Sequence, residues 1–256
     1  MSAARHPTSE DEPGALPNRL ILLHTSDARG VVGIATGDRV VGEVLDSHGQ
    51  HARSLLGTLE RLMQRAEMAM DTVEGCVVTL GPGSFTGIRI GLATAQGLTA
   101  ARGCSVWVCD SLRPEAAAAL PVPPAATNHA VGDAPVAVVQ DARRGEVYAA
   151  LYDVRAPVPR ELVAPFCDAP GAACDRLFAA APASRMILLG TGASLVATVP
   201  GAAKRIELRE RPTGLAVLAA LHGLARAGDC RKREPHQLAP TYLRRSDAEI
   251  KREQGS

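Results

Sequence analysis

The sequence has almost no net charge: 28 basic residues are set against 27 acidic ones in 256 residues, which leaves a formal balance of +1. A protein that holds nucleic acid unaided usually carries a strong positive field, so this balance argues against RNA binding by the chain alone. Lysine is scarce and arginine is spread along the whole chain. We attribute that bias to codon usage rather than to phosphate contacts.

Metal-binding and membrane-spanning patterns are missing as well. The six cysteines form no C-x-x-C pair, and none lies at zinc-finger spacing from a histidine, so reduced and buried thiols are expected. No apolar run approaches the roughly 18 residues of a membrane span, and the N-terminus lacks the apolar core of a signal peptide. We therefore expect a cytoplasmic protein with no membrane contact and no metal site.

Two polar ends flank the predicted fold. Residues 1–17 are rich in Pro and Ser without an apolar period, which predicts a disordered leader, and residues 246–256 predict a charged tail. The hydrophobic content of 46% is enough for a substantial core. We expect a first lobe at residues 18–110 and a second lobe with a closing C-terminal helix at residues 111–245.

The first half alternates strands and helices. Three short apolar runs that begin at Arg19 predict an antiparallel meander. An amphipathic helix is predicted over residues 51–70, and residues 76–80 form an unbroken apolar run typical of a buried parallel strand. A helix over residues 86–101 and a strand over residues 105–109 complete a right-handed β–α–β unit.

The second half repeats this alternation. Strands are predicted over residues 136–140 and 146–154, a helix over residues 172–181, a strand over residues 186–189 and a second-lobe helix over residues 213–227. Strands that alternate with helices in both halves predict the α/β class.

The loop GPGSFTG at the start of the 86–101 helix is a candidate nucleotide or anion site, because backbone N–H groups and the helix dipole attract phosphate there. Its spacing matches neither the dinucleotide fingerprint nor the P-loop. A structural turn whose glycines permit unusual backbone angles is the other interpretation. The residues that would bind the anion are Gly81, Gly83, Ser84, Thr86 and Gly87.

Two predicted helices are candidates for a partner surface. The 86–101 helix has small residues along one side and no charge between Arg89 and Arg102, which predicts burial against its own sheet and against either the second lobe or another protein. The 51–70 helix has apolar residues at every seventh position, which fits a helix partner or wider core packing. The candidate partner-binding residues are Leu56, Met63, Met70, Arg89, Gly91, Thr94, Ala95 and Leu98.

No catalytic residue is assigned. Ser84 lies outside a G-x-S-x-G motif, no H-E-x-x-H occurs, and the histidines share no ligand spacing on a helix face. Asp141 and Glu146 flank a tight turn and could pair for acid–base work. Because two arginines lie between them, an Asx-turn with local charge pairing explains these residues more simply.

The string GPGSFTGIRIGLATAQGL at residues 81–98 resembles the signature of the TsaB (YeaZ) family. The opening strand and turn at residues 20–35, the block QDARRGEVY at residues 140–148 and the string PTYLR at residues 240–244 follow in the order of such proteins. The resemblance covers residues 19–247.

This resemblance implies an actin/Hsp70-like (ASKHA) fold with two related lobes, each a mixed sheet flanked by helices. It also implies a non-catalytic subunit that pairs with and activates TsaD, which holds the metal and transfers the threonylcarbamoyl group to the adenosine next to the tRNA anticodon. TsaD-like and TsaE-like proteins would be the partners, tRNA would be contacted only within the complex, and ATP and metal would belong to the partner subunits. Without its partner the chain is expected to form an isologous homodimer.

The family likeness places the partner surface on the helices at residues 54–70 and 86–101, with Gly91 and Ala95 most sensitive to bulk. Members usually carry aspartate where this chain has His24, and a neutral imidazole is a poor ligand for magnesium. We expect no lysine or second carboxylate nearby to compensate. The alternative of an autonomous nucleotide-binding ATPase is therefore disfavoured, and a peptidase lacks any recognisable nucleophile or metal set.

Overall fold

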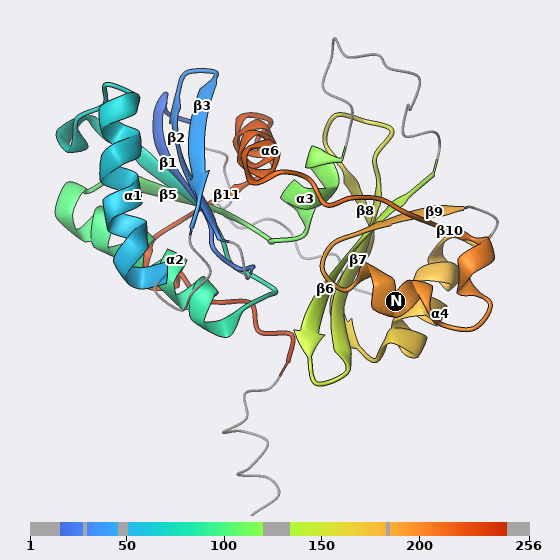
Figure 1. Cartoon of the computed structure of the whole chain (residues 1–256). Helices are drawn as coiled ribbons and strands as arrows, with labels where there is room; N and C mark the ends of the chain where they lie inside the picture. Colours follow the sequence, from blue (N-terminus) through green and yellow to red (C-terminus); the bar gives the residue numbers. More distant parts are fainter. Residues whose placement is uncertain (1–15, 28–29, 46–50, 120–133, 183–184, 245–256) are drawn as a thin grey trace, which may run out of the picture.

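The protein is described by a computed structural model that covers residues 16–27, 30–45, 51–119, 134–182 and 185–244 (Figure 1). Most of the predicted leader at residues 1–17 and the whole predicted tail at residues 246–256 lie outside the described residues.

The first sheet has six strands in the order β11-β5-β4-β1-β2-β3. Strands β1, β2 and β3 form the predicted antiparallel meander, while β4 runs parallel to both β1 and β5. The bounds are β1 (Arg19–His24), β2 (Val31–Thr36), β3 (Arg39–Val44), β4 (Gly75–Thr79), β5 (Ser105–Cys109) and β11 (Arg231–Arg233).

The second sheet repeats this plan in the order β10-β9-β6-β7-β8. Strands β6, β7 and β8 again form an antiparallel meander, and two parallel strands again extend from its first strand. The shared order confirms the prediction of an α/β fold with two related lobes, each a mixed sheet flanked by helices. The bounds are β6 (Val136–Arg143), β7 (Glu146–Asp153), β8 (Arg160–Asp168), β9 (Met186–Leu189) and β10 (Ile206–Leu208).

The outer face of each sheet is covered by two helices (Figure 1). Helices α1 (His51–Arg65) and α2 (Phe85–Arg102) bury apolar side chains such as Leu62 and Ile88 against the first sheet. Helices α4 (Pro170–Ala180) and α5 (Ala193–Ala197) do the same on the second. Short 3-10 turns follow at residues 70–72, 202–204 and 235–237.

The inner helices are exchanged between the lobes. Helix α3 (Arg113–Ala118) follows β5 of the first sheet but packs against β6 of the second. Helix α6 (Gly214–Arg226) follows β10 of the second sheet but packs against β1, β2 and β3 of the first, and α3 and α6 contact each other (Figure 1). The prediction that the 213–227 helix belongs to the second lobe is therefore wrong, and β11 likewise belongs to the first sheet.

Two glycines explain why α6 fits closely on the first sheet. Gly33 of β2 and Gly42 of β3 are paired across the ladder. A Cβ atom on Gly33 would lie 2.9 Å from Leu218 Cδ1, and one on Gly42 would collide with the same atom. Because neither glycine has a side chain, there is room for the side chain of Leu218, which is 0% exposed.

Helix α1 ends at Arg65 rather than at Met70 as predicted. Glu67 adopts a left-handed φ of 51°, and the N–H of Met68 donates to the carbonyl of Met63 at 2.9 Å, an arrangement that closes a helix. None of the described helices combines the length and the apolar character that crossing a membrane requires.

We predict that Leu218→Ala lowers the free energy of unfolding by about 2–5 kcal/mol, because it leaves a cavity between α6 and the paired glycines. Urea unfolding followed by circular dichroism measures the change. Leu215→Ala on the same helix is the matched control, since Leu215 is 50% exposed and should change stability by less than about 0.5 kcal/mol. Equal losses for the two variants would contradict the placement of α6.

Candidate functional site

The glycine loop between β4 and α2 packs against the turn that follows β1. The N–H of Ser84 donates to the carbonyl of Ser26 at 2.6 Å, and the N–H of Gly87 donates to Ser84 Oγ at 3.2 Å. A Cβ atom on Gly83 would collide with the Ser26 carbonyl oxygen, and one on Gly87 would collide with that of Thr25. Two N–H groups that an anion would need are thus already bonded, and the glycines serve close backbone packing.

The start of the same loop is covered by the C-terminal segment. The N–H of Thr241 donates to the carbonyl of Leu80 at 2.8 Å, and a Cβ atom on Gly81 would lie 2.9 Å from the carbonyl oxygen of Thr241. Thr86 is exposed at the first turn of α2. These contacts favour the structural turn over the nucleotide or anion site.

The candidate partner-binding residues divide into two groups. Met63, Gly91, Ala95 and Leu98 are buried in the core of the first lobe, and a Cβ atom on Gly91 would collide with Thr25 Oγ1. Bulk at Gly91 or Ala95 would therefore disrupt the chain's own core, which corrects their assignment to the partner surface. The exposed or half-buried members are Leu56, Met70, Arg89 and Thr94.

The opposite side of α2 is exposed and uncharged. It presents Ala93, Gln96, Gly97 and Ala100. The main contacts of α2 are with β4, β5, α1 and the turn at residues 235–237, all of which lie with the first sheet. Among the described residues, the second lobe is therefore not a main covering surface of this helix.

An aromatic stack extends this exposed face at the start of α2. The rings of Phe85 and Tyr242 have centroids 5.1 Å apart, and both residues are 43% exposed. The guanidinium carbon of Arg89 lies 3.7 Å from the Phe85 centroid, and Arg89 Nε donates to Tyr242 Oη at 2.9 Å. No sequence pattern identified Phe85 or Tyr242 as surface residues, although they are two of only six Phe and Tyr residues.

A buried cluster of polar residues joins the two lobes. Glu115 of α3, 0% exposed, accepts a hydrogen bond from Gln140 Nε2 of β6 at 2.7 Å and one from Arg211 Nη2 at 2.9 Å. The Arg211 guanidinium, in the segment before α6, also pairs with Asp27, which follows β1. His24 at the end of β1 completes the cluster, which the sequence analysis missed apart from His24.

The charges in this cluster sustain one another. Burial by itself would raise the pKa of Glu115, but the neighbouring His24 and Arg211 hold it below its ordinary value. Burial likewise opposes the charge on Arg211, yet Glu115 and Asp27 raise the pKa of its guanidinium. Glu115 and Arg211 are therefore both ionised at neutral pH.

The expectation that no carboxylate lies near His24 is wrong. His24 Nε2 is 3.8 Å from Glu115 Oε1, and Asp27 belongs to the same cluster. Arg211 supplies the positive charge that these carboxylates require. In the described ranges, no group of three or more His, Cys, Asp or Glu side chains is placed to hold a metal ion.

The turn between β6 and β7 has the predicted Asx geometry. The N–H of Arg143 donates to Asp141 Oδ1 at 2.7 Å, and Arg143 and Arg144 both have left-handed φ angles. Glu146 pairs with Arg244 at 3.0 Å. Asp141 and Glu146 thus each pair with an arginine and do not form an acid–base pair.

We predict that Glu115→Gln lowers the free energy of unfolding at pH 7 by roughly 3–5 kcal/mol, because it removes one partner of a buried ion network. The pKa of Glu115 is lower in the folded than in the unfolded protein. Its contribution to the free energy of unfolding is therefore fully present above the unfolded pKa of about 4.3 and is lost as pH falls through the folded pKa. Urea unfolding between about pH 7 and pH 3 should therefore show a shallower acid loss for the variant than for the wild type. Exposed Glu60→Gln is the control, and parallel pH curves for wild type and Glu115→Gln would refute the assignment.

Comparisons with known proteins agree with this architecture. The family model described as "TsaD: tRNA N6-adenosine threonylcarbamoyltransferase" matches residues 45–252. The tRNA threonylcarbamoyladenosine biosynthesis protein TsaB of Bacillus subtilis (strain 168) is 27% identical over 242 residues, which cover 91% of this chain and 96% of the relative. An uncharacterised protein of Mycobacterium tuberculosis (strain ATCC 25618 / H37Rv) is 30% identical over 221 residues, which cover 84% of this chain and 83% of the relative.

Solved structures share the fold. A Pseudomonas aeruginosa protein described as having similarity to peptidase YEAZ has a TM-score of 0.72 at 24% identity, with 89% of this chain and 100% of that chain covered. YeaZ from Pseudomonas aeruginosa gives a TM-score of 0.68 at the same identity and coverage. With the family match over most of its length, the chain belongs to the tRNA N6-adenosine threonylcarbamoyltransferase family, and it is similar to the TsaB relative over almost its full length.

Proposed function

We propose that this protein is a non-catalytic subunit that pairs with a TsaD-like transferase and activates it for threonylcarbamoyl transfer to the adenosine next to the anticodon of tRNA, in the cytoplasm. Family membership and the name of the Bacillus subtilis relative support a role in threonylcarbamoyladenosine formation. The observation that carries the pairing is the exposed, uncharged face of α2.

This face is unusual for a helix in contact with water. Ala93, Gln96, Gly97 and Ala100 are exposed, yet no charged residue lies between Arg89 and Arg102. An exposed helix face normally carries charged side chains, so its composition fits coverage by another protein. Burial of about 800 Å² per partner at roughly 25 cal/mol per Å² favours association even after the entropic cost of docking.

Neighbouring apolar side chains widen the proposed surface. Leu56 on α1 is 64% exposed, and α1 lies beside α2 on the same face of the sheet (Figure 1). The stack of Phe85 and Tyr242 borders the start of α2. In the absence of a TsaD-like partner, the same surface would pair isologously in a homodimer.

Several features support a chain without chemistry of its own. Ser84 and Gly87 in the glycine loop have bonded N–H groups, and the carboxylates beside His24 pair with Arg211. We therefore assign ATP and metal to the TsaD-like and TsaE-like partners. The formal charge of +1 fits a subunit that meets tRNA only within the complex.

We predict that Ala93→Arg weakens pairing with a TsaD-like protein at least about 100-fold and lowers transfer accordingly, because an unpaired charge buried in an interface costs roughly 3–5 kcal/mol. Calorimetric titration measures the affinity, and circular dichroism checks the fold. Ala179→Arg is the matched control, since Ala179 is exposed on α4 of the second lobe. Wild-type affinity in Ala93→Arg would exclude α2 from the interface.

A further inference from the structure

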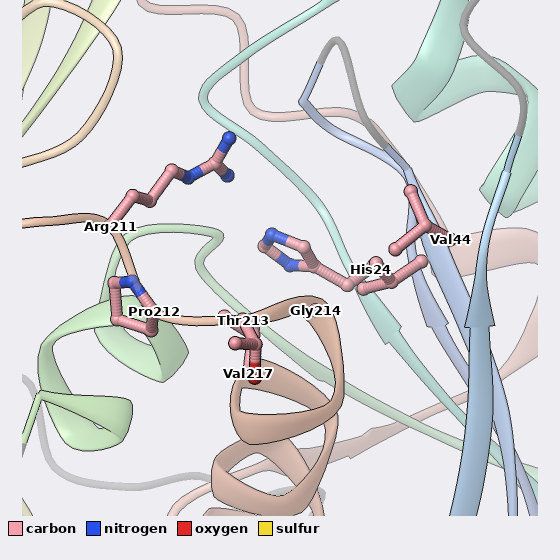
Figure 2. A pocket seen from close by; sticks show the side chains of 8 residues that line it. His24, Val44, Arg211, Pro212, Thr213, Gly214 and Val217 are labelled. Carbon is pink, nitrogen blue, oxygen red and sulfur yellow. The ribbon is translucent and has the colours of Figure 1, made fainter.

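A pocket of about 180 Å³ opens beside the interlobe cluster, between the end of β1 and the start of α6 (Figure 2). This volume corresponds to on the order of six water molecules at roughly 30 Å³ each. The pocket is therefore smaller than a site for a drug-sized ligand. The lining residues are His24, Val31, Val44, Arg211, Pro212, Thr213, Gly214 and Val217.

His24 is the unusual member of this lining. Its side chain is 1% exposed, yet neither ring nitrogen has a hydrogen-bond partner within the described part of the chain. The 3.8 Å between its Nε2 and Glu115 Oε1 is too long for a hydrogen bond. Figure 2 shows the ring directed from β1 toward Arg211 and the start of α6. Buried polar groups are nearly always bonded, so this ring requires a hydrogen-bond partner that the described residues do not supply.

Two further kinds of donor belong to residues that line the pocket. Arg211 Nε is buried and has no hydrogen-bond partner among the residues the structure describes. Helix α6, of 13 residues, begins at the pocket, where Thr213 Oγ1 accepts from the N–H of Ala216 at 3.2 Å. The positive end of the helix dipole and the remaining N–H groups of the first turn therefore add to the donors.

The acidic residues lie behind these donors and do not line the pocket. Glu115 and Asp27 both pair with Arg211, and Glu115 also lies beside His24. They hold the guanidinium in place, in the way that outer carboxylates orient the ligands of a binding site. The remaining wall is hydrocarbon from Val31, Val44 and Val217.

We propose that this pocket binds a small carboxylate with a short apolar tail. The carboxylate accepts hydrogen bonds from His24, from Arg211 Nε and from the first turn of α6, while the tail lies against the valines. A wall of donors at a helix N-terminus is complementary to an oxyanion, and the hydrocarbon wall selects against a fully hydrated inorganic ion. The site is on the opposite face of the first sheet from α2, so it stands or falls independently of the proposed pairing.

The test is a titration of the full chain with isobutyrate, followed by amide and histidine-ring NMR shifts. Isobutyramide, which has the same shape without charge, and inorganic phosphate are the ligand controls. We expect saturable shifts at His24 and at residues 213–217 with a dissociation constant on the order of 1 mM, and none with isobutyramide. His24→Phe should weaken isobutyrate at least about 10-fold, whereas Leu195→Ser at an exposed site on α5 should not.

Absence of saturable shifts at His24 and residues 213–217 in the wild type would overturn the proposal. Equal binding of isobutyramide would overturn the role of the donors, and preference for phosphate would overturn the carboxylate assignment. If His24→Phe does not fold, the comparison of isobutyrate, isobutyramide and phosphate binding to the wild-type chain still tests the proposal.

Discussion

The arrangement of the lobes depends on the buried pairing of Glu115 with Arg211. Glu115 also binds Gln140 of the second sheet, and Arg211 also binds Asp27 beside the first sheet, so a single cluster joins both lobes. Buried charges are tolerated only when each finds a partner, which makes removal of one member costly to the others. Together with the contact between α3 and α6, the cluster thereby fixes the relative position of the two lobes.

This fixed arrangement also determines which surfaces remain available. Because α3 and α6 are exchanged between the lobes, the inner faces of both sheets are covered from within the chain. Among the described residues, the second lobe makes no main contact with α2, and the outer face of this helix is the one whose composition fits a protein partner. Close packing of Gly83 and Gly87 against the turn after β1 holds this helix rigidly in place.

Local patterns predicted much of the fold but not its long-range contacts. The meander and the β4–α2–β5 unit follow from apolar runs and turn residues. The apolar face of α6 could pack on either sheet, and only the fit of Leu218 between the paired glycines Gly33 and Gly42 selects the first sheet. Small residues such as Gly91 give the same pattern whether a neighbouring turn or a partner helix approaches. Glu115 and Arg211 are 96 positions apart, and no local signal connects two isolated charged residues at that distance.

The most direct experiment is reconstitution of threonylcarbamoyl transfer to tRNA with TsaD-like and TsaE-like proteins and a TsaC-like protein that makes threonylcarbamoyl-AMP, with and without this chain. ATP hydrolysis by the chain alone is measured alongside. We expect transfer only when the chain is present and able to pair with the TsaD-like protein, and no ATP hydrolysis by the chain in isolation. Transfer at full rate without it, or ATP hydrolysis by the isolated chain, would contradict a non-catalytic partner subunit.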